Sequence, residues 1–186
     1  MIMGMPKKSS PFELLLDIDQ LYRSVGDNLP EQKVLQSKTW TGIGFQLDSH
    51  YFVIGIDHLE EIILEPSYTY IPIVKPWLKG VANMRGHLLP VMDLNKLFGM
   101  TSGTSRKQHR VMAVKSPDEG YVGFLVDAVY GMQHFSMDSI LSTKTVDVPE
   151  LLLPFVSGVY QGGQQNWLVF DAKSFMASSQ FLAIGQ

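Results

Sequence analysis

The amino-acid sequence predicts an all-β fold, built either as a sandwich or as a pair of small barrels. Short runs with a period of two recur at even spacing from Trp40 onward, and glycine-rich turns separate them. Long helical crossovers of the kind that a parallel α/β sheet requires do not separate these runs. We therefore expect a sequence of antiparallel hairpins.

The first 37 residues predict a helical extension and a linker that precede the β fold. Ser10-Pro11-Phe12-Glu13 combines a capping-box serine and glutamate with proline at the first helical position, and Gly26 is the expected stop. The expected organisation is an extension at 1–37, a domain at 38–180 and a tail at 181–186. The predicted helix carries an apolar stripe at helical spacing: Leu14, Ile18, Leu21 and Val25.

Turn residues mark the boundaries between the strands that we expect in the domain. Two prolines between residues 68 and 77 cannot donate to a ladder, so this stretch should connect strands or lie at an edge. The expected turns are residues 48–50, 85–86, 116–120 and 161–164. The expected strands are residues 43–47, 51–56, 61–64, 81–84, 88–92, 111–114, 121–129, 155–160 and 167–170.

Two short helical pieces complete the expected fold. Residues 95–98 predict one helical turn, which Gly99 ends. A closing helix is expected after the last strand, with Phe175, Met176 and Phe181 as candidate packing residues.

Composition and charge limit the class of protein. With 45% hydrophobic and 18% charged residues among 186, the chain has enough apolar material to bury a globular core. It contains no cysteine, which excludes disulfides, thiolate metal sites and a cysteine nucleophile. The sequence has no signal peptide and no apolar run of about 20 residues, so we expect a soluble, cytoplasmic protein without direct membrane insertion.

Nucleic acid is not an expected partner. The net charge of −3 provides no basic face for a phosphate backbone. The one basic cluster, Arg106, Lys107, His109 and Arg110, lies in a Gly/Ser/Thr loop and is interpreted as a solvated loop entering a strand. A β-barrel that binds nucleic acid would need aromatic residues interleaved with Lys and Arg on one face, and the strands carry too few basic residues.

Three carboxylates at similar strand ends are the only candidates for catalysis or metal binding. Asp93, Asp127 and Asp171 each follow two apolar residues. Asp93 and Asp171 precede short helical segments, where an aspartate caps the first turn, so we expect capping there. Asp127 has no helix after it and could face a turn or a partner. The five histidines are scattered, and no phosphate, dinucleotide or nucleophile-elbow motif is present, so we expect no catalytic, cofactor or metal site.

Residues 77–94 read WLKGVANMRGHLLPVMDL. This run resembles the signature of the CheW family, in which KGV, RG and PV-x-DL recur at these spacings. Further similarities are the LEEI strand at 59–62, the VGFLVDAV strand at 122–129 and the VSG turn at 156–158. The resemblance covers about residues 38–180 and leaves out the N-terminal helix.

A narrower resemblance concerns one branch of the family. The opening PFELL at 11–15, WTGIGF at 40–45 and VKPW at 74–77 are similar to the PilI-like adaptors, which serve type IV pilus chemosensory systems in twitching motility. The flagellar chemotaxis adaptors of the same family are the alternative, because the same fold serves both pathways.

The resemblance implies both the architecture and the function. It implies two packed five-stranded SH3-like barrels, between which the chain crosses, and no enzymatic activity or cofactor. The implied role is a scaffold that couples methyl-accepting chemoreceptors to a CheA-type histidine kinase. The implied partners are the cytoplasmic tip of the receptor, bound in the groove between the barrels, and the regulatory domain of the kinase, bound along exposed edges.

Several residues of this chain are implied to contribute to partner contact, although a structural role remains open for each. Gly86 could act only through a turn with positive φ. Arg85 could bind a carboxylate on a partner or on Glu61 of the same chain. Alternation alone does not show which apolar residues face the core. The implied contact residues are Leu59, Glu61, Gly80, Asn83, Arg85, Gly86, Val129 and Met132.

Overall fold

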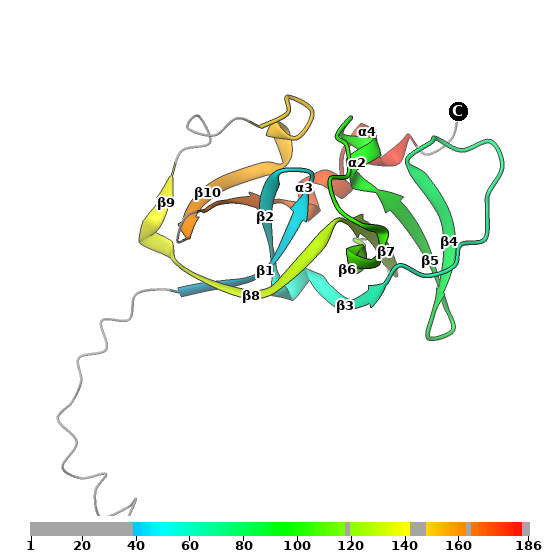
Figure 1. Ribbon diagram of the computed structural model, residues 1–186, viewed down its shortest axis with the longest axis horizontal. Coiled ribbons are helices and arrows are strands. Elements are labelled where there is room, and N and C mark those ends of the chain that lie inside the picture. The colour runs from blue at the N-terminus through cyan, green and yellow to red at the C-terminus, as the bar shows by residue number, and fades with distance from the viewer. Residues whose placement is uncertain (1–38, 118–119, 142–147, 163–164, 184–186) are drawn as a thin grey trace, which may run out of the picture. The chain divides into compact units, whose positions relative to one another are not determined.

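The computed structural model describes residues 39–117, 120–141, 148–162 and 165–183 (Figure 1). The predicted helix and linker at 1–37 lie outside the described residues. The described part of the chain forms two sheets, as Figure 1 shows, with short helices beside them. The predicted all-β class is confirmed.

The first sheet has six strands in the order β8-β1-β2-β11-β10-β9. All neighbours in it are antiparallel except β2 and β11, which run parallel. Its strands are β1 (Thr39–Leu47), β2 (His50–Gly55), β8 (Ala128–Ser136), β9 (Ile140–Leu141), β10 (Val156–Gly162) and β11 (Gln165–Phe170).

The second sheet has five strands in the order β3-β6-β7-β5-β4. Here β5 and β7 form the parallel pair, and the other neighbours are antiparallel. Its strands are β3 (Leu59–Leu64), β4 (Leu78–Met84), β5 (His87–Asp93), β6 (Arg110–Lys115) and β7 (Tyr121–Val126). The chain thus leaves the first sheet after β2, builds the whole second sheet, and returns with β8.

The helices within the described ranges are all short. The α-helices are α2 (Leu94–Leu97), α3 (Ala172–Met176) and α4 (Ser179–Leu182). Single 3₁₀ turns are η1 (Ile56–His58), η2 (Arg106–Gln108), η3 (Met137–Ser139) and η5 (Leu153–Phe155).

The two sheets repeat one arrangement. In each, an antiparallel hairpin with an irregular register (β4–β5 and β10–β11) leads into an aspartate and a short helix. Equivalent hydrogen bonds join Asp93 N to Trp77 O and Asp171 N to Phe155 O, both at 2.8 Å. In each sheet the second strand of this hairpin then pairs in parallel with the second strand of another hairpin. The similar strand ends noted in the sequence at Asp93 and Asp171 therefore reflect equivalent places in two related sheets.

Contacts between strands that lie far apart in each sheet close that sheet into a small barrel. In the second sheet, β3 and β4 lie at opposite edges, yet Glu61 on β3 pairs with Arg85 at the end of β4. The segment after β3 also adds a bridge to β4, through mutual hydrogen bonds of Thr69 and Val81. In the first sheet, Phe135 on the edge strand β8 stacks on a β10 ring 4.7 Å away. The predicted SH3-like barrels are consistent with this closure.

The core has three parts because the central strands bury both faces. On β6, Met112 and Val114 belong to the largest cluster, which both sheets share, whereas Val111 and Ala113 belong to a cluster within the second sheet. A third cluster lies in the first sheet and includes Phe135 and two β10–β11 aromatics. Burial on both faces is the reason that these strands read as continuous apolar runs rather than strict alternation.

Two sequence expectations about strands were wrong in detail. The single strand expected at 121–129 is divided at Asp127: β7 belongs to the second sheet and β8 to the first. The remainder of β8 was not predicted, because its burial alternates poorly and glycine interrupts it at Gly131, where φ is +73°. The first barrel also has a sixth strand, β9, which is two residues long and too short for a period to be visible.

Candidate partner-binding surface

A two-residue turn presents the centre of the signature. Arg85 and Gly86 connect β4 to β5, and both have positive φ, +51° and +87°. This is the requirement of a type I′ turn, whose twist matches the strands that it joins. Asn83 Oδ1 accepts a hydrogen bond from Gly86 N at 2.8 Å. The positive φ predicted for Gly86 is confirmed, and Asn83 has a structural role in the turn.

The Arg85 guanidinium is held by an ion pair within the chain. Its Nη2 donates to Glu61 Oε1 at 2.9 Å. The internal salt bridge, left open by the sequence, is therefore present. The Arg85 side chain is nevertheless 78% exposed, so Glu61 positions the guanidinium at the surface without covering it.

Gly80 is buried and allows two segments to approach. Its φ is +134°, and a Cβ atom there would collide with the carbonyl oxygen of Thr69. The Thr69–Val81 bridge that joins the loop to β4 lies beside it. Gly80 therefore determines the path of β4, and its burial leaves it no surface for direct contact.

The three apolar residues implied as partner contacts differ in exposure. Leu59 and Val129 are half-buried and pack against the large core cluster. Met132, in contrast, is 61% exposed on β8. Its neighbour Tyr130 is also exposed and was not predicted. Met132 and Tyr130 therefore supply most of the apolar surface of this strand.

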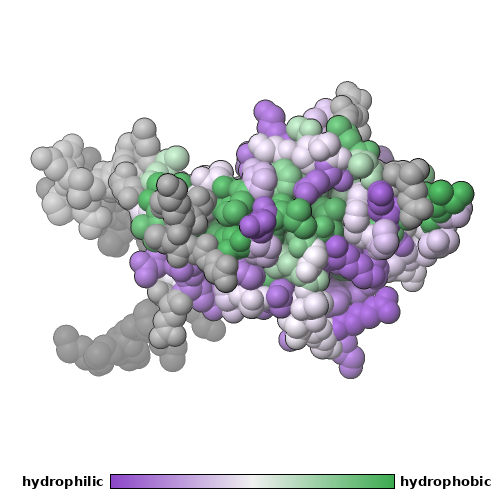
Figure 2. Space-filling model, turned by 90° about the horizontal axis from the view of Figure 1, so that it is seen from above, coloured by the Kyte–Doolittle hydropathy of each residue, from purple (hydrophilic) through white to green (hydrophobic). Residues whose placement is uncertain are grey.

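The edge strand β3 offers a second apolar strip that sequence reasoning missed. Its burial alternates along the strand, and Ile62 and Leu64 lie on the exposed side, Leu64 at 68%. Alternation alone did not show which face was exposed, because both faces of the strand carry apolar residues. Apolar surface also gathers across the centre of the face seen in Figure 2, between polar regions.

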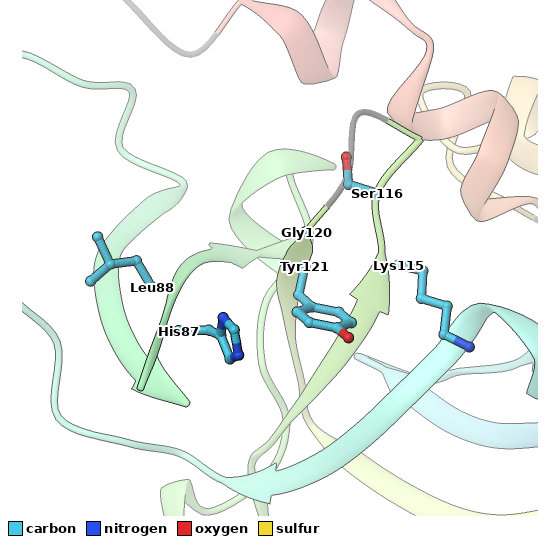
Figure 3. Close-up of a pocket in the computed structure, with 6 residues that line it drawn as sticks. All are labelled: His87, Leu88, Lys115, Ser116, Gly120 and Tyr121. Carbon is cyan, nitrogen blue, oxygen red and sulfur yellow. The ribbon is translucent and has the colours of Figure 1, made fainter. Parts of the chain in front are cut away.

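A hollow of about 610 Å³ lies between the β4–β5 and β6–β7 hairpins (Figure 3). Figure 3 shows the rings of His87 and Tyr121 facing each other, and they meet edge to face at 6.4 Å between centroids. Leu88, next to His87, is 78% exposed. The hollow has a wide mouth, and both polar and apolar side chains line it. The lining residues are His87, Leu88, Lys115, Ser116, Gly120 and Tyr121.

The basic loop is tied to the end of β3 by a nearly buried carboxylate. Glu65 has a side chain only 7% exposed, and its Oε2 lies 3.1 Å from Arg106 Nε and 3.3 Å from His109 Nδ1. Burial raises the pKa of Glu65, but the hydrogen bond and charge of Arg106 outweigh it, so the pKa of Glu65 is lowered. The folded state is therefore stabilised by the ionised carboxylate.

We expect Glu65→Gln to reduce the loss of unfolding free energy that the protein undergoes as the pH falls into the acid range. A lowered pKa means that the Glu65 contribution is present above the pKa of the unfolded chain, about 4.3, and is lost as pH falls through the folded value. Thermal unfolding at neutral and acid pH should show the variant less stable near neutrality and closest to wild type at the acid end. Glu150→Gln, at an exposed position, is the control. An equal deficit at every pH would contradict the prediction.

The strand-end carboxylates have structural partners. Asp93 Oδ1 accepts from Lys96 N at 3.1 Å, and Asp171 Oδ1 accepts from Ser174 N at 3.0 Å, so the predicted capping is confirmed at both. Asp127 is 1% exposed and has no helix to cap. The predicted alternative of a turn applies, since Asp127 accepts from Asp48 N at 2.6 Å in the β1–β2 turn.

Ser102 and His109 lie beside Asp127 in an arrangement that resembles part of a hydrolase site. Ser102 Oγ lies 3.1 Å from His109 Nε2 and also hydrogen-bonds Asp127 Oδ1. A carboxylate can only accept, so the serine proton is directed to Asp127 and His109 must donate to Ser102. In this arrangement the imidazole donates to the hydroxyl instead of accepting its proton.

Metal-binding clusters and membrane-spanning helices are both absent from the described residues. No group of three or more histidine, aspartate and glutamate side chains among them is arranged to hold a metal ion. None of the helices in the described ranges is long and apolar enough to cross a membrane.

Comparison with known proteins agrees with this geometry. Residues 41–180 match the CheW-like domain. Protein PilI of Pseudomonas aeruginosa is 42% identical over 176 residues, which cover 94% of this chain and 96% of that protein. Chemotaxis protein CheW of Thermotoga maritima is 28% identical over 125 residues, covering 67% of this chain and 76% of that protein.

A solved structure supports the same assignment. The crystal structure of the scaffolding protein TtCheW from Thermoanaerobacter tengcongensis superposes with a TM-score of 0.66 at 25% identity. The match covers 76% of this chain and 94% of that one. The two sheets, the signature turn and these similarities together establish that the chain belongs to the CheW-like family and resembles its PilI-like branch.

Proposed function

We propose that this chain is a non-catalytic adaptor that couples methyl-accepting chemoreceptors to a CheA-type histidine kinase in a type IV pilus chemosensory system. The observation that carries the proposal is the 42% identity to PilI over 94% of the chain. In this role the protein works in the cytoplasm, recruited to receptor arrays at the membrane, and controls twitching motility. Flagellar chemotaxis is the alternative pathway. It is ranked second because the chemotaxis protein CheW of Thermotoga maritima is less similar to this chain than PilI is.

The eight residues implied by the family resemblance are proposed as contributors to partner contact in three ways. Met132 and Arg85 are exposed and can touch a partner directly. Gly80 and Gly86 act through the backbone, because their positive φ values determine the path of the chain. Leu59, Glu61, Asn83 and Val129 support the exposed residues by packing and by hydrogen bonds.

We expect Met132→Lys to reduce capture of a chemoreceptor by this protein, because a charge on β8 would have to be buried against the receptor. The measurement is an affinity capture from membranes and cytoplasm of the source bacterium, with receptor and kinase identified by mass spectrometry. Met132→Leu, which keeps the position apolar, is the matched control. Both variants should unfold at the wild-type temperature, since the side chain is largely exposed.

The outcomes separate the possible readings. Recovery of a chemoreceptor and a histidine kinase by wild type and Met132→Leu, with loss of the receptor from Met132→Lys, supports the adaptor. The genes encoding the recovered kinase then distinguish the pilus pathway from the flagellar one. Failure of the wild type to retain either partner would remove the basis of the proposal.

A further inference from the structure

Lys107 stands on a ridge between two hollows that separate β3 from β8. One hollow, of about 270 Å³, is bounded by β8 and the η2 loop, and the other, of about 570 Å³, by β3 and the same loop. Lys107 lines both of them. A segment of a partner that fills both hollows would therefore lie against this side chain.

The other cations of the loop are engaged within the chain. Arg110 Nη1 donates to the carbonyl oxygens of residues 107, 108 and 109, at distances of 3.0, 3.0 and 2.8 Å, and so holds the η2 turn. Arg106 pairs with Glu65 at 3.1 Å. Lys107 is exposed and forms no ion pair with any carboxylate of the described residues.

The flanks of the ridge carry neutral and apolar side chains beside charges that are already engaged within the chain. None of the described carboxylates lines the hollow beside β8, and its far wall includes Gln46, Val129 and Tyr130. Tyr130 OH donates to Gln46 Oε1 at 2.6 Å, which holds that wall in place. On the other side, Leu64 projects from β3 at 68% exposure and lines the second hollow. The surface thus has apolar side chains on both flanks and one unpaired positive charge between them.

We infer that Lys107 binds a carboxylate of an amphipathic helix that lies across the ridge, with apolar residues of that helix against Leu64 on one side and Tyr130 on the other. A helix suits this pattern because residues three and four apart share a face, so a carboxylate and its apolar neighbours can meet the surface together. The inference rests on the proposed function, in which the helix belongs to the receptor, and specifies the side-chain chemistry by which that helix is recognised.

Charge reversal at Lys107 provides the test. The probe is the purified cytoplasmic signalling fragment of the captured receptor, with its affinity measured by fluorescence anisotropy at several salt concentrations. We expect Lys107→Glu to weaken binding about tenfold at low salt, since reversal replaces an attraction by a repulsion. The deficit should shrink from about 50 mM to about 500 mM salt, as the Debye length falls from about 14 Å to about 4 Å. Lys107→Arg should bind like the wild type.

A matched control and a reciprocal change complete the design. Lys173→Glu makes the same change of net charge on α3, at an exposed position, and should leave the affinity unchanged. Replacing the facing glutamate or aspartate of the fragment by lysine should restore binding to Lys107→Glu. Each of these results supports a specific ion pair at this position.

The failures are distinguishable. Wild-type binding that Lys107→Glu leaves unchanged at every salt concentration would overturn the inference and leave the adaptor proposal standing. An equal loss from Lys173→Glu would also overturn it, because general repulsion would then account for the effect. A fragment that does not bind the wild type overturns the adaptor proposal and this inference with it.

Discussion

Phe175→Ala is expected to lower the free energy of unfolding by about 3–5 kcal/mol, the usual cost of removing a buried phenyl ring. Phe175 lies on α3 and has no exposed surface. Its ring meets five other phenylalanine rings at centroid distances of 5.2–5.6 Å, and these come from both sheets, from α4, from η5 and from the end of α2. The neighbours are Phe98, Phe124, Phe155, Phe170 and Phe181. Because they are held by different elements, we expect them to close only partly around the cavity.

Chemical denaturation of the purified variant measures this loss. Leu182→Ala on α4 is the control, because Leu182 is 64% exposed and should cost less than about 1 kcal/mol. A Phe175→Ala protein as stable as the control would mean that the closing helices do not support the core that the two sheets share. The expected loss would make α3 and α4 part of the folding unit.

Local features of this fold could be predicted because each depends on neighbouring residues alone. An aspartate before a short helix caps the first turn wherever the chain goes next, so the roles of Asp93 and Asp171 followed from their positions. The Arg85-Gly86 turn likewise depends on two residues between two apolar runs. The hairpins followed from the same short-range information.

The exchange of strands between sheets depends on distant residues and could not be predicted. Residues 121–129 read as one apolar run, but β8 pairs with β1, far away in the sequence, and β7 with β5 and β6. No local signal separates the two halves, because Asp127 is the only charged residue in a run that is otherwise apolar or glycine. The number of barrels and their closure therefore came from the family resemblance and not from periodicity.

The candidate surface was predictable only in part for a similar reason. The resemblance indicated Met132, and the structure exposes it, whereas Leu64 and Tyr130 were not singled out. In a protein whose central strands bury both faces, an apolar residue on an edge strand looks the same in the sequence as one in the core. The position of Lys107 between two hollows depends on how the loop folds over β3 and β8, which Arg110 and Glu65 determine.

Asp127→Ala should destabilise the protein by about 3–5 kcal/mol, although the substitution creates only a small cavity. The carboxylate lies at the point where the chain passes from β7 in the second sheet to β8 in the first. It accepts hydrogen bonds from Asp48 N at 2.6 Å, from Asn95 Nδ2 at 3.0 Å and from the Ser102 hydroxyl. Removing one partner of a buried charged network leaves the others without their acceptor, at a cost of about 1–3 kcal/mol for each buried donor that water cannot reach.

Asp127→Asn tests whether this network, rather than side-chain volume, holds the two sheets together. The asparagine amide has nearly the same shape as the carboxylate, but its NH₂ group faces hydrogen-bond donors and cannot accept from them. We therefore expect the free energy of unfolding to fall by about 2 kcal/mol, less than for Asp127→Ala. Asp57→Ala is the control, since that side chain is 77% exposed. Denaturation monitored by the tryptophans of the first sheet and by amide exchange in the second should show both sheets weakened together. A loss of stability confined to one sheet would contradict the role of Asp127 in joining the two sheets. Donors from the β1–β2 turn and from α2 meet at this carboxylate, so both sheets should be affected.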